Sequence, residues 1–343
     1  MKIIVLGAGK VGSNIAKNLS VQSYDICVVD KAVSKLKKLQ SEYDLAIVSG
    51  HASHPDVLKK AGIDSDTILI SVTNDDEVNI VACQIAKQIF DVKKTICRLS
   101  DSSYIKNLSA FGKEMIDIPI SPELEVTDHI IELIDHPGAE LIETFADGKV
   151  KLVSVKAKRG GKLVNRELKS IKNDIPDIDT FVPTIYRKNK AIVPDGNTVI
   201  KENDQVYFLS AEKNIDSILK EMRDQTVDSS RIMIVGGGMI GSSLASSLEN
   251  KYKVKVLETS LERCEMLSKD LNKAIVLNGD GSDEELLRSE NIENIDVFCA
   301  LTDDDETNIM SAFLAKKLGA KKTLIILNNY CLLYTSPSPR DSA

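Results

Sequence analysis

The sequence of 343 residues contains no tryptophan, only six cysteines and no C-x-x-C pair. Scattered cysteines without metal or redox spacing indicate reduced core residues of a cytoplasmic protein. Basic residues are not in excess, because 44 Lys and Arg face 51 Asp and Glu, and the net charge of −7 argues against nucleic acid as a partner. No apolar run approaches the roughly 18 residues of a membrane-spanning helix, and we expect no secretory signal at the N-terminus.

The common catalytic motifs are also missing. The sequence has no G-x-S-x-G nucleophile elbow, no P-loop and no H-E-x-x-H zinc motif. No separate substrate domain offers an evident acid–base pair. We therefore expect no catalytic residues, no metal site and a bound nucleotide that is sensed rather than consumed.

What the sequence does contain is a glycine-rich stretch near its start. Residues 3–12 read IIVLGAGKVG, an apolar run followed by Gly7, Gly9 and Gly12. This pattern predicts a buried strand, a tight turn and a helix whose N-terminus binds phosphates. The first glycine permits the turn, the second lets a pyrophosphate approach, and the third lets helix and strand pack closely. The predicted loop also includes Ala8, Lys10 and Val11.

A carboxylate follows this loop at the spacing that a dinucleotide site requires. Asp30 lies 18 residues after Gly12 and ends the apolar strand that precedes it. A carboxylate at this place binds the ribose hydroxyls of a dinucleotide. The loop and the acid together favour nucleotide binding over the alternative, a glycine-rich turn that binds nothing.

The same pattern occurs a second time. Residues 232–241 read IMIVGGGMIG, and Glu258 lies 17 residues after the last glycine. At an offset of 229, the segment Thr73–Asn79 (TNDDEVN) corresponds to Thr302–Asn308 (TDDDETN). We infer an internal duplication with two nucleotide sites, the second containing Gly236, Gly238, Gly241 and Glu258.

Alternating strands and helices in each copy predict an α/β fold of tandem Rossmann-type, doubly wound parallel sheets. Between them, shorter strands predict a small α+β module with helices at Leu163–Ile171 and Ile215–Arg223. A helix that begins at Ser121 and Pro122 is either a linker or a crossover helix that packs on a neighbouring subunit. The expected units are a first Rossmann unit (1–120), this helix (121–140), the small module (141–223), a linker (224–230), an incomplete second Rossmann unit (231–330) and a tail (331–343).

The tail reads CLLYTSPSPRDSA and departs from the repeat. We interpret it as foreign sequence at a truncated end, with a native disordered tail as the alternative.

The two acidic loops should lie at the carboxyl edge of each sheet, where nucleotides bind. Thr73 or Asn74 is predicted to cap the next helix, and both are candidate nucleotide contacts, as is Thr302 in the second copy. A divalent cation bound by Asp75–Glu77 and by Asp303–Glu306 is the alternative.

Three further positions are candidate contacts. His51, in the segment GHASHP with His54, is predicted beside the adenine half of the nucleotide rather than at a zinc site, and its counterpart is Asp280. Lys10 should meet a phosphate, whereas Met239 replaces it in the second copy. Arg98 either reaches a phosphate or forms a surface salt bridge, and its counterpart at the same offset is Leu327.

These motifs, in this order over residues 1–330, resemble the TrkA family of Trk potassium-uptake regulatory proteins. The resemblance implies tandem RCK (KTN) units, each a Rossmann subdomain with a small C-terminal subdomain. It implies binding of NAD(H) and of ATP or ADP, self-association through RCK domains, and a membrane potassium-transporter subunit of the TrkH/TrkG type as partner. It also implies a peripheral place on the inner face of the plasma membrane. The second small subdomain of the family is missing from this chain.

Two classes of function therefore remain. The first is a non-catalytic, nucleotide-sensing subunit of a potassium transporter. The second is an NAD(P)-dependent oxidoreductase with a histidine near His51 as its proton-transfer group.

Overall fold

The computed structural model describes residues 2–22, 24–108, 115–146, 148–171, 178–222 and 230–327. It divides into two compact units, Met1–Glu125 (unit 1) and Val126–Ala343 (unit 2). The tail at 331–343 lies outside the described residues. None of the helices within the described ranges combines the length and the apolar character needed to cross a bilayer.

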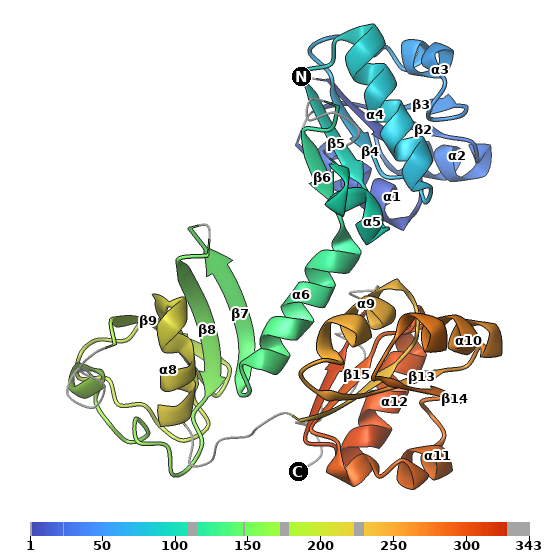
Figure 1. Ribbon diagram of the computed structural model, residues 1–343. Helices are drawn as coiled ribbons and strands as arrows, with labels where there is room; N and C mark the ends of the chain where they lie inside the picture. Colours follow the sequence, from blue (N-terminus) through green and yellow to red (C-terminus); the bar gives the residue numbers. More distant parts are fainter. Residues whose placement is uncertain are drawn as a thin grey trace. The chain divides into compact units, whose positions relative to one another are not determined.

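Unit 1 is a six-stranded parallel sheet in the order β3-β2-β1-β4-β5-β6, with helices on both faces (Figure 1). This is the predicted doubly wound arrangement, and the order of the strands reverses between β1 and β4. The strands are β1 (Lys2–Leu6), β2 (Asp25–Asp30), β3 (Ala46–Ser49), β4 (Ile68–Ser71), β5 (Lys94–Arg98) and β6 (Ile118–Ile120). The helices are α1 (Lys10–Ser20), α2 (Val33–Glu42), α3 (Pro55–Lys60), α4 (Asp76–Phe90) and α5 (Ser102–Lys106).

The central strand β1 is apolar throughout because both faces of this sheet are covered. Ile4 and Leu6 pack into the core beneath α3 and α4, whereas Ile3 and Val5 pack into the core beneath α1 and α2. This alternation places every side chain of the run in one of two cores.

Two predicted elements of unit 1 differ from the structure. The apolar residues of this stretch predict a last strand at Met115–Ile118, but the strand begins at Ile118, because the Asp117 carboxylate instead accepts hydrogen bonds from the backbone N–H and hydroxyl of Thr95. The sequence also predicts a helix near Tyr104–Phe111, but the helix begins at Ser102, after Asp101 caps it, and ends at Lys106.

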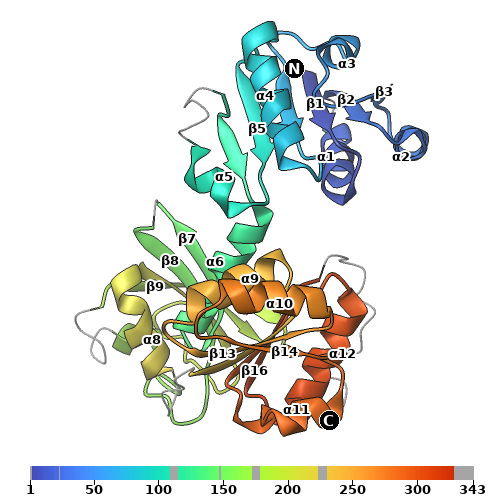
Figure 2. The same cartoon turned by 45° about the vertical axis from the view of Figure 1, so that its right-hand side comes forward.

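Unit 2 contains the small module and the second parallel sheet (Figures 1 and 2). The module is an antiparallel sheet in the order β10-β9-β11-β8-β7 with α8 (Ile215–Glu221) packed in its core. Its strands are β7 (Ala139–Phe145), β8 (Val150–Lys156), β9 (Thr180–Arg187), β10 (Lys190–Ile192) and β11 (Gln205–Ala211), with 3-10 turns η2 (Leu168–Ser170) and η3 (Glu212–Asn214).

The prediction of a helix at Leu163–Ile171 is wrong over most of this segment, because only the short 3-10 turn η2 forms there. The backbone N–H groups of Leu163 and Asn165 donate to Glu221 and Ile200, outside this segment, and Asn165 adopts a left-handed φ of 65°. These tertiary hydrogen bonds replace the i to i−4 bonds of a helix, although the apolar spacing of the segment is helical.

The second parallel sheet has the order β14-β13-β12-β15-β16, which repeats the first five strands of unit 1. Its strands are β12 (Arg231–Val235), β13 (Lys253–Glu258), β14 (Ile275–Asn278), β15 (Val297–Ala300) and β16 (Lys322–Ile325). Its helices are α9 (Met239–Leu248), α10 (Leu261–Asp270), α11 (Glu284–Ser289), η4 (Ile292–Asn294) and α12 (Asp305–Lys317).

Helix α6 (Pro122–Asp135) begins in unit 1 and continues into unit 2. Within unit 2, Ile130 and Ile134 pack into the core that α9 and α10 share with the second sheet, and Leu133 packs into the small module. The apolar face of α6 is thus buried by its own chain along this part of the helix.

Candidate nucleotide-binding sites

The first glycine loop has the geometry that a phosphate-binding turn requires. Gly7 adopts φ +104°, which a residue with a side chain rarely does. A Cβ atom on Gly12 would lie 1.8 Å from the carbonyl oxygen of Gly7, so helix and strand can pack only with glycine there. A Cβ on Gly9 would meet nothing closer than an Asn74 oxygen at 3.9 Å. The space in front of Gly9 is therefore open, which fits the close approach of a phosphate.

The second loop repeats each of these features. Gly236 adopts φ +100°, and a Cβ on Gly241 would lie 1.9 Å from the Gly236 carbonyl oxygen. A Cβ on Gly238 would have nothing within 4 Å. Both loops therefore leave open the position that the diphosphate of a dinucleotide would occupy.

The acid at the end of the second strand is connected to the loop in both copies. One Asp30 oxygen accepts from the Ala8 N–H at 2.6 Å and the other from the Ala32 N–H at 2.7 Å. A carboxylate has about four acceptor sites, so lone pairs remain for ribose hydroxyls. Asp30 thus holds the glycine loop and the start of α2 in place while keeping the capacity to bind a sugar.

Glu258 makes the equivalent contacts, with the Gly237 N–H at 2.7 Å and the Ser260 N–H at 2.8 Å. Partial burial of the Glu258 carboxyl raises its pKa, but these backbone donors outweigh burial, and the pKa lies below its ordinary value. The carboxylate is therefore charged at neutral pH, as a ribose acceptor must be.

A cleft of about 290 Å³ opens at the carboxyl edge of the first sheet. It brings together four of the predicted contacts, Gly7, Asp30, Thr73 and Asn74, at the place where the strand order reverses. Two cations that sequence analysis did not single out, Lys31 and Lys35, complete its lining, and they would offset the negative charge of a phosphate. The other lining residues are Val29, Gly50, Ala52, Asp75 and Val78.

The acidic loop is closed by a residue that sequence analysis missed. The fully buried Asn79 side chain accepts hydrogen bonds from the Ser71 and Thr73 hydroxyls and the Thr73 N–H, and it donates to the carbonyl oxygens of Thr73 and Arg98. Asn308 makes the same contacts with Thr302 and Ile326. The repetition of T-x-D-D-E-x-N was the signal that could have revealed this asparagine clamp.

The predicted helix caps are displaced by one or two residues. Asp75, not Thr73 or Asn74, caps α4 by accepting from the Val78 N–H, and Asp304 caps α12 in the same way. Asp76 is buried and accepts from the N–H groups of Ser100 and Asp101. Within the described ranges, no group of three or more His, Cys, Asp or Glu is arranged to bind a metal ion.

His51 makes its hydrogen bonds within its own loop. Its Nδ1 accepts from the Ser53 N–H and lies 2.9 Å from the Ser53 hydroxyl, and the residue does not belong to the lining of the cleft. Asp280 makes the same two contacts with Ser282 in the second copy. Burial, followed by the charge of Lys31, lowers the pKa of His51, which favours the neutral ring.

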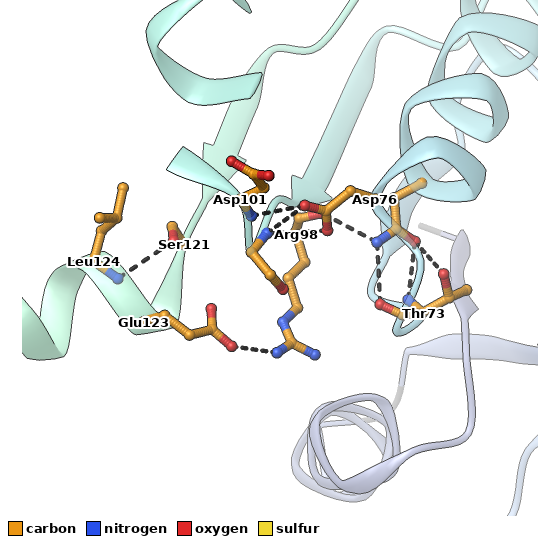
Figure 3. Close-up of polar contacts among 9 residues, drawn as sticks. Thr73, Asp76, Arg98, Asp101, Ser121, Glu123 and Leu124 are labelled. Atoms are coloured by element: carbon orange, nitrogen blue, oxygen red, sulfur yellow. Dashed lines mark hydrogen bonds and ion pairs between the residues drawn. The ribbon is translucent and has the colours of Figure 1, made fainter. Parts of the chain in front are cut away.

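Arg98 forms a salt bridge, but not at the surface. Its guanidinium pairs with Glu123 in the first turn of α6, and both side chains are largely buried, at 15% and 14% exposed (Figure 3). Arg98 does not belong to the lining of the cleft. Its counterpart is Ile326 rather than Leu327, because the two asparagine clamps reach Arg98 and Ile326, and the repeat offset falls to 228 at this strand.

A larger hollow, of about 600 Å³, lies at the opposite edge of the second sheet. Residues at the starts of its strands, Arg231, Lys253 and Ile275, contribute to the lining. Ligands of open parallel sheets bind at the carboxyl ends of the strands, so we do not assign the nucleotide to this hollow.

Comparison with known proteins agrees with the duplicated architecture. Residues 3–122 and 232–330 each match the TrkA-N domain family, and residues 152–223 match the TrkA-C domain family. The Trk system potassium uptake protein TrkA of Halomonas elongata is 46% identical over 331 residues, which are 96% of this chain and 72% of that protein.

Two solved structures share the fold at low sequence identity. The crystal structure of the GsuK RCK domain has a TM-score of 0.65 at 15% identity and covers 94% of this chain and 73% of its own. The GsuK channel bound to NAD has a TM-score of 0.64 at 14% identity and covers 94% and 61%. On the identity that extends over nearly its whole length and on the three domain matches, this chain belongs to the TrkA family of Trk potassium-uptake proteins.

Proposed function

We propose that this chain is a nucleotide-binding regulatory subunit of a Trk-type potassium uptake system. In this role it binds NAD(H), and ADP or ATP in competition, and the nucleotide controls potassium transport without being oxidised or hydrolysed. Its partner is a membrane transporter subunit of the TrkH/TrkG type, on the inner face of the plasma membrane, and its RCK units associate with one another.

The observation that carries this proposal is the duplicated site. Each copy combines an open second glycine with a carboxylate that is hydrogen-bonded to the loop. The identity to proteins named for potassium uptake supports the biological role. The GsuK channel bound to NAD has the same fold, which supports the choice of NAD as ligand.

The proposed contacts follow from this geometry. In the first site the loop binds the diphosphate, Asp30 binds the adenosine ribose, and Thr73 and Asn74 contact the other half of the nucleotide. In the second site Glu258 and Thr302 have the corresponding roles. The loops themselves are Gly7–Gly12 and Gly236–Gly241, and we assign the two sites to Rossmann subdomains at 1–120 and 231–330, with a small C-terminal subdomain at 141–223.

The main alternative, a nicotinamide-dependent oxidoreductase, depended on His51. The His51 ring is hydrogen-bonded to Ser53 in its own loop. No observation on the described residues favours a role for it in proton transfer. We therefore keep the sensing function as the conclusion.

The test is NADH binding, followed by the fluorescence of the cofactor, which no tryptophan of this chain obscures. We expect NADH to bind and to remain reduced. The Asp30→Ala and Glu258→Ala variants should each lose about tenfold in affinity at one site, because a charged hydrogen bond contributes roughly 1.5–3 kcal/mol. Asp30→Asn should have an intermediate effect, since its amide oxygen can still accept from the Ala8 N–H.

Matched controls are Asp25→Ala, an exposed carboxylate at the opposite end of β2, and Glu262→Ala, an exposed acid in the first turn of α10. Neither should change the affinity. Oxidation of NADH by added substrates would support the enzyme instead. The transport role is tested by potassium flux into proteoliposomes that contain a TrkH/TrkG-type subunit, with this chain and NADH added or omitted.

A further inference from the structure

The acidic loop connects the cleft of unit 1 to a second element through a continuous series of contacts. Thr73 lines the cleft, and its N–H, hydroxyl and carbonyl groups are all bonded to the Asn79 side chain. The same asparagine amide donates to the carbonyl oxygen of Arg98 at 3.0 Å. A displacement of Thr73 would therefore reach the end of β5, because the Asn79 side chain that joins the two is fully buried in a packed interior.

From the end of β5 the contacts continue to α6. The Arg98 guanidinium binds the Glu123 carboxylate in the first turn of that helix, and Figure 3 shows the two side chains pointing toward each other from β5 and α6. Backbone pairing reinforces the connection, since the Leu99 N–H donates to the Ile120 carbonyl oxygen at 2.9 Å. At the start of α6, the Ser121 hydroxyl oxygen accepts from the Leu124 N–H at 3.3 Å. An ion pair that is mostly buried has few alternative geometries, so it holds the first turn of α6 at the end of β5.

The second copy lacks this extension. Its asparagine clamp ends at the carbonyl oxygen of Ile326, whose side chain carries no charge. The clamp is thus common to both sheets, whereas the cation at its end is present in the first sheet and is replaced by Ile326 in the second. This difference confines the proposed role of the cation to the first site.

We propose that Arg98 and Glu123 are positioning residues that couple occupancy of the nucleotide cleft in unit 1 to the first turn of α6. The inference rests on the proposed function, because it takes NAD(H) as the ligand of the cleft. Nucleotide binding at Thr73 moves the asparagine clamp, the clamp moves Arg98, and the ion pair carries the displacement to the helix that leads into unit 2. Neither residue touches the nucleotide.

The test compares NADH affinity with hydrogen exchange of the amides at 123–127 in the full chain. In wild type, NADH should change the exchange rate of these amides by about fivefold. The double variant Arg98→Met with Glu123→Met removes both charges, which avoids leaving one of them buried and alone. It should bind NADH within about threefold of wild type but show less than about a twofold change in exchange rate at 123–127.

The matched control is Glu125→Gln, an exposed acid in the same helical turn, which should behave as wild type. A merely structural role predicts that the single variants are disturbed and that the double variant regains the full response to NADH. That result, or a wild type that binds NADH with no change in exchange at 123–127, would overturn the inference and leave the proposed function intact. A wild type that binds no NADH would instead refute the proposed function, and the inference with it.

Discussion

The two parallel sheets reach the same loop geometry with different residues. In unit 1 the loop contains Ala8 and the acid is Asp30, whereas in unit 2 the loop contains Gly237 and the acid is Glu258. A Cβ on Gly237 would lie 3.1 Å from the Glu258 carboxylate and 2.5 Å from Leu267. Leu267 and the longer acid together therefore occupy the space that the alanine methyl group takes in unit 1. What is kept constant is the position of the carboxylate, 2.6 Å and 2.7 Å from the loop N–H.

The charges around the two loops differ more than their geometry. Unit 1 has Lys10 at the start of α1, whereas unit 2 has the exposed Met239 at the start of α9. Lys35 lines the first cleft, but Arg263, the equivalent third residue of α10, donates to the carbonyl oxygen of Gly237 at 2.7 Å. Duplication thus preserved the geometry of the glycine loop, while the charges around the loop diverged.

Removal of the asparagine clamp, which both units share, is expected to have the largest effect on stability. Asn79→Ala should lower the free energy of local opening at 71–80 by about 2–3 kcal/mol, because buried carbonyl and N–H groups lose their partners. Asn308→Ala should do the same at 300–309. Native-state hydrogen exchange of the Thr73 and Thr302 amides measures this opening.

The Asn79→Ala variant should be the more affected, since it also removes the acceptor of the Ser71 hydroxyl. The equivalent residue in unit 2 is Ala300, which has no hydroxyl. Ser71→Ala, which makes unit 1 resemble unit 2, should cost less than about 1 kcal/mol. Equal exchange in wild type and in either asparagine variant would show that the clamp does not hold the loop.

A pH-dependent contact distinguishes unit 2. Asp296, just before β15, accepts from the N–H groups of Ser230 and Arg231 and pairs with Lys321, whereas unit 1 has the uncharged Thr67 at the equivalent place. Burial raises the pKa of Asp296, but Lys321 and the backbone donors outweigh it and lower the pKa from 3.8 to about 2.

Asp296→Asn should therefore destabilise the start of β12 at neutral pH by roughly 1 kcal/mol. The contribution of the carboxylate is complete above about pH 4 and is lost as the pH falls through about 2, so the gap between wild type and variant should narrow by about pH 3 and close only at lower pH. Hydrogen exchange at 230–235 between neutral pH and about pH 3 measures this narrowing. Asp270→Asn, an exposed acid on α10, is the control, and a gap that stays constant with pH would contradict the assigned charge.

The smallest expected effect comes from exchanging the loop residues that differ in charge. Lys10→Met should weaken ATP binding at the first site by about threefold at low salt and less at high salt, because an exposed charge is screened. Met239→Lys should strengthen ATP binding at the second site by a similar factor. Each is measured by calorimetric titration in a background where Glu258→Ala or Asp30→Ala has weakened the other site.

Lys17→Met, in the last turn of the same helix α1, removes an equal charge away from the loop and should leave ATP affinity unchanged. Identical salt dependence in Lys10→Met and wild type would show that Lys10 does not face the phosphates.

The sequence by itself determined the duplication, the two doubly wound sheets and the two glycine loops with their acids. It could do so because these features depend on local periodicity and on spacing within one strand–turn–helix unit, which fix backbone geometry. Only the tertiary structure decided the partners of Arg98 and Asn79, the loop-closing role of His51 and the fate of residues 163–171. Each of these depends on which distant backbone or charged groups come within hydrogen-bond distance, and a buried polar group takes the partner that the packed fold supplies.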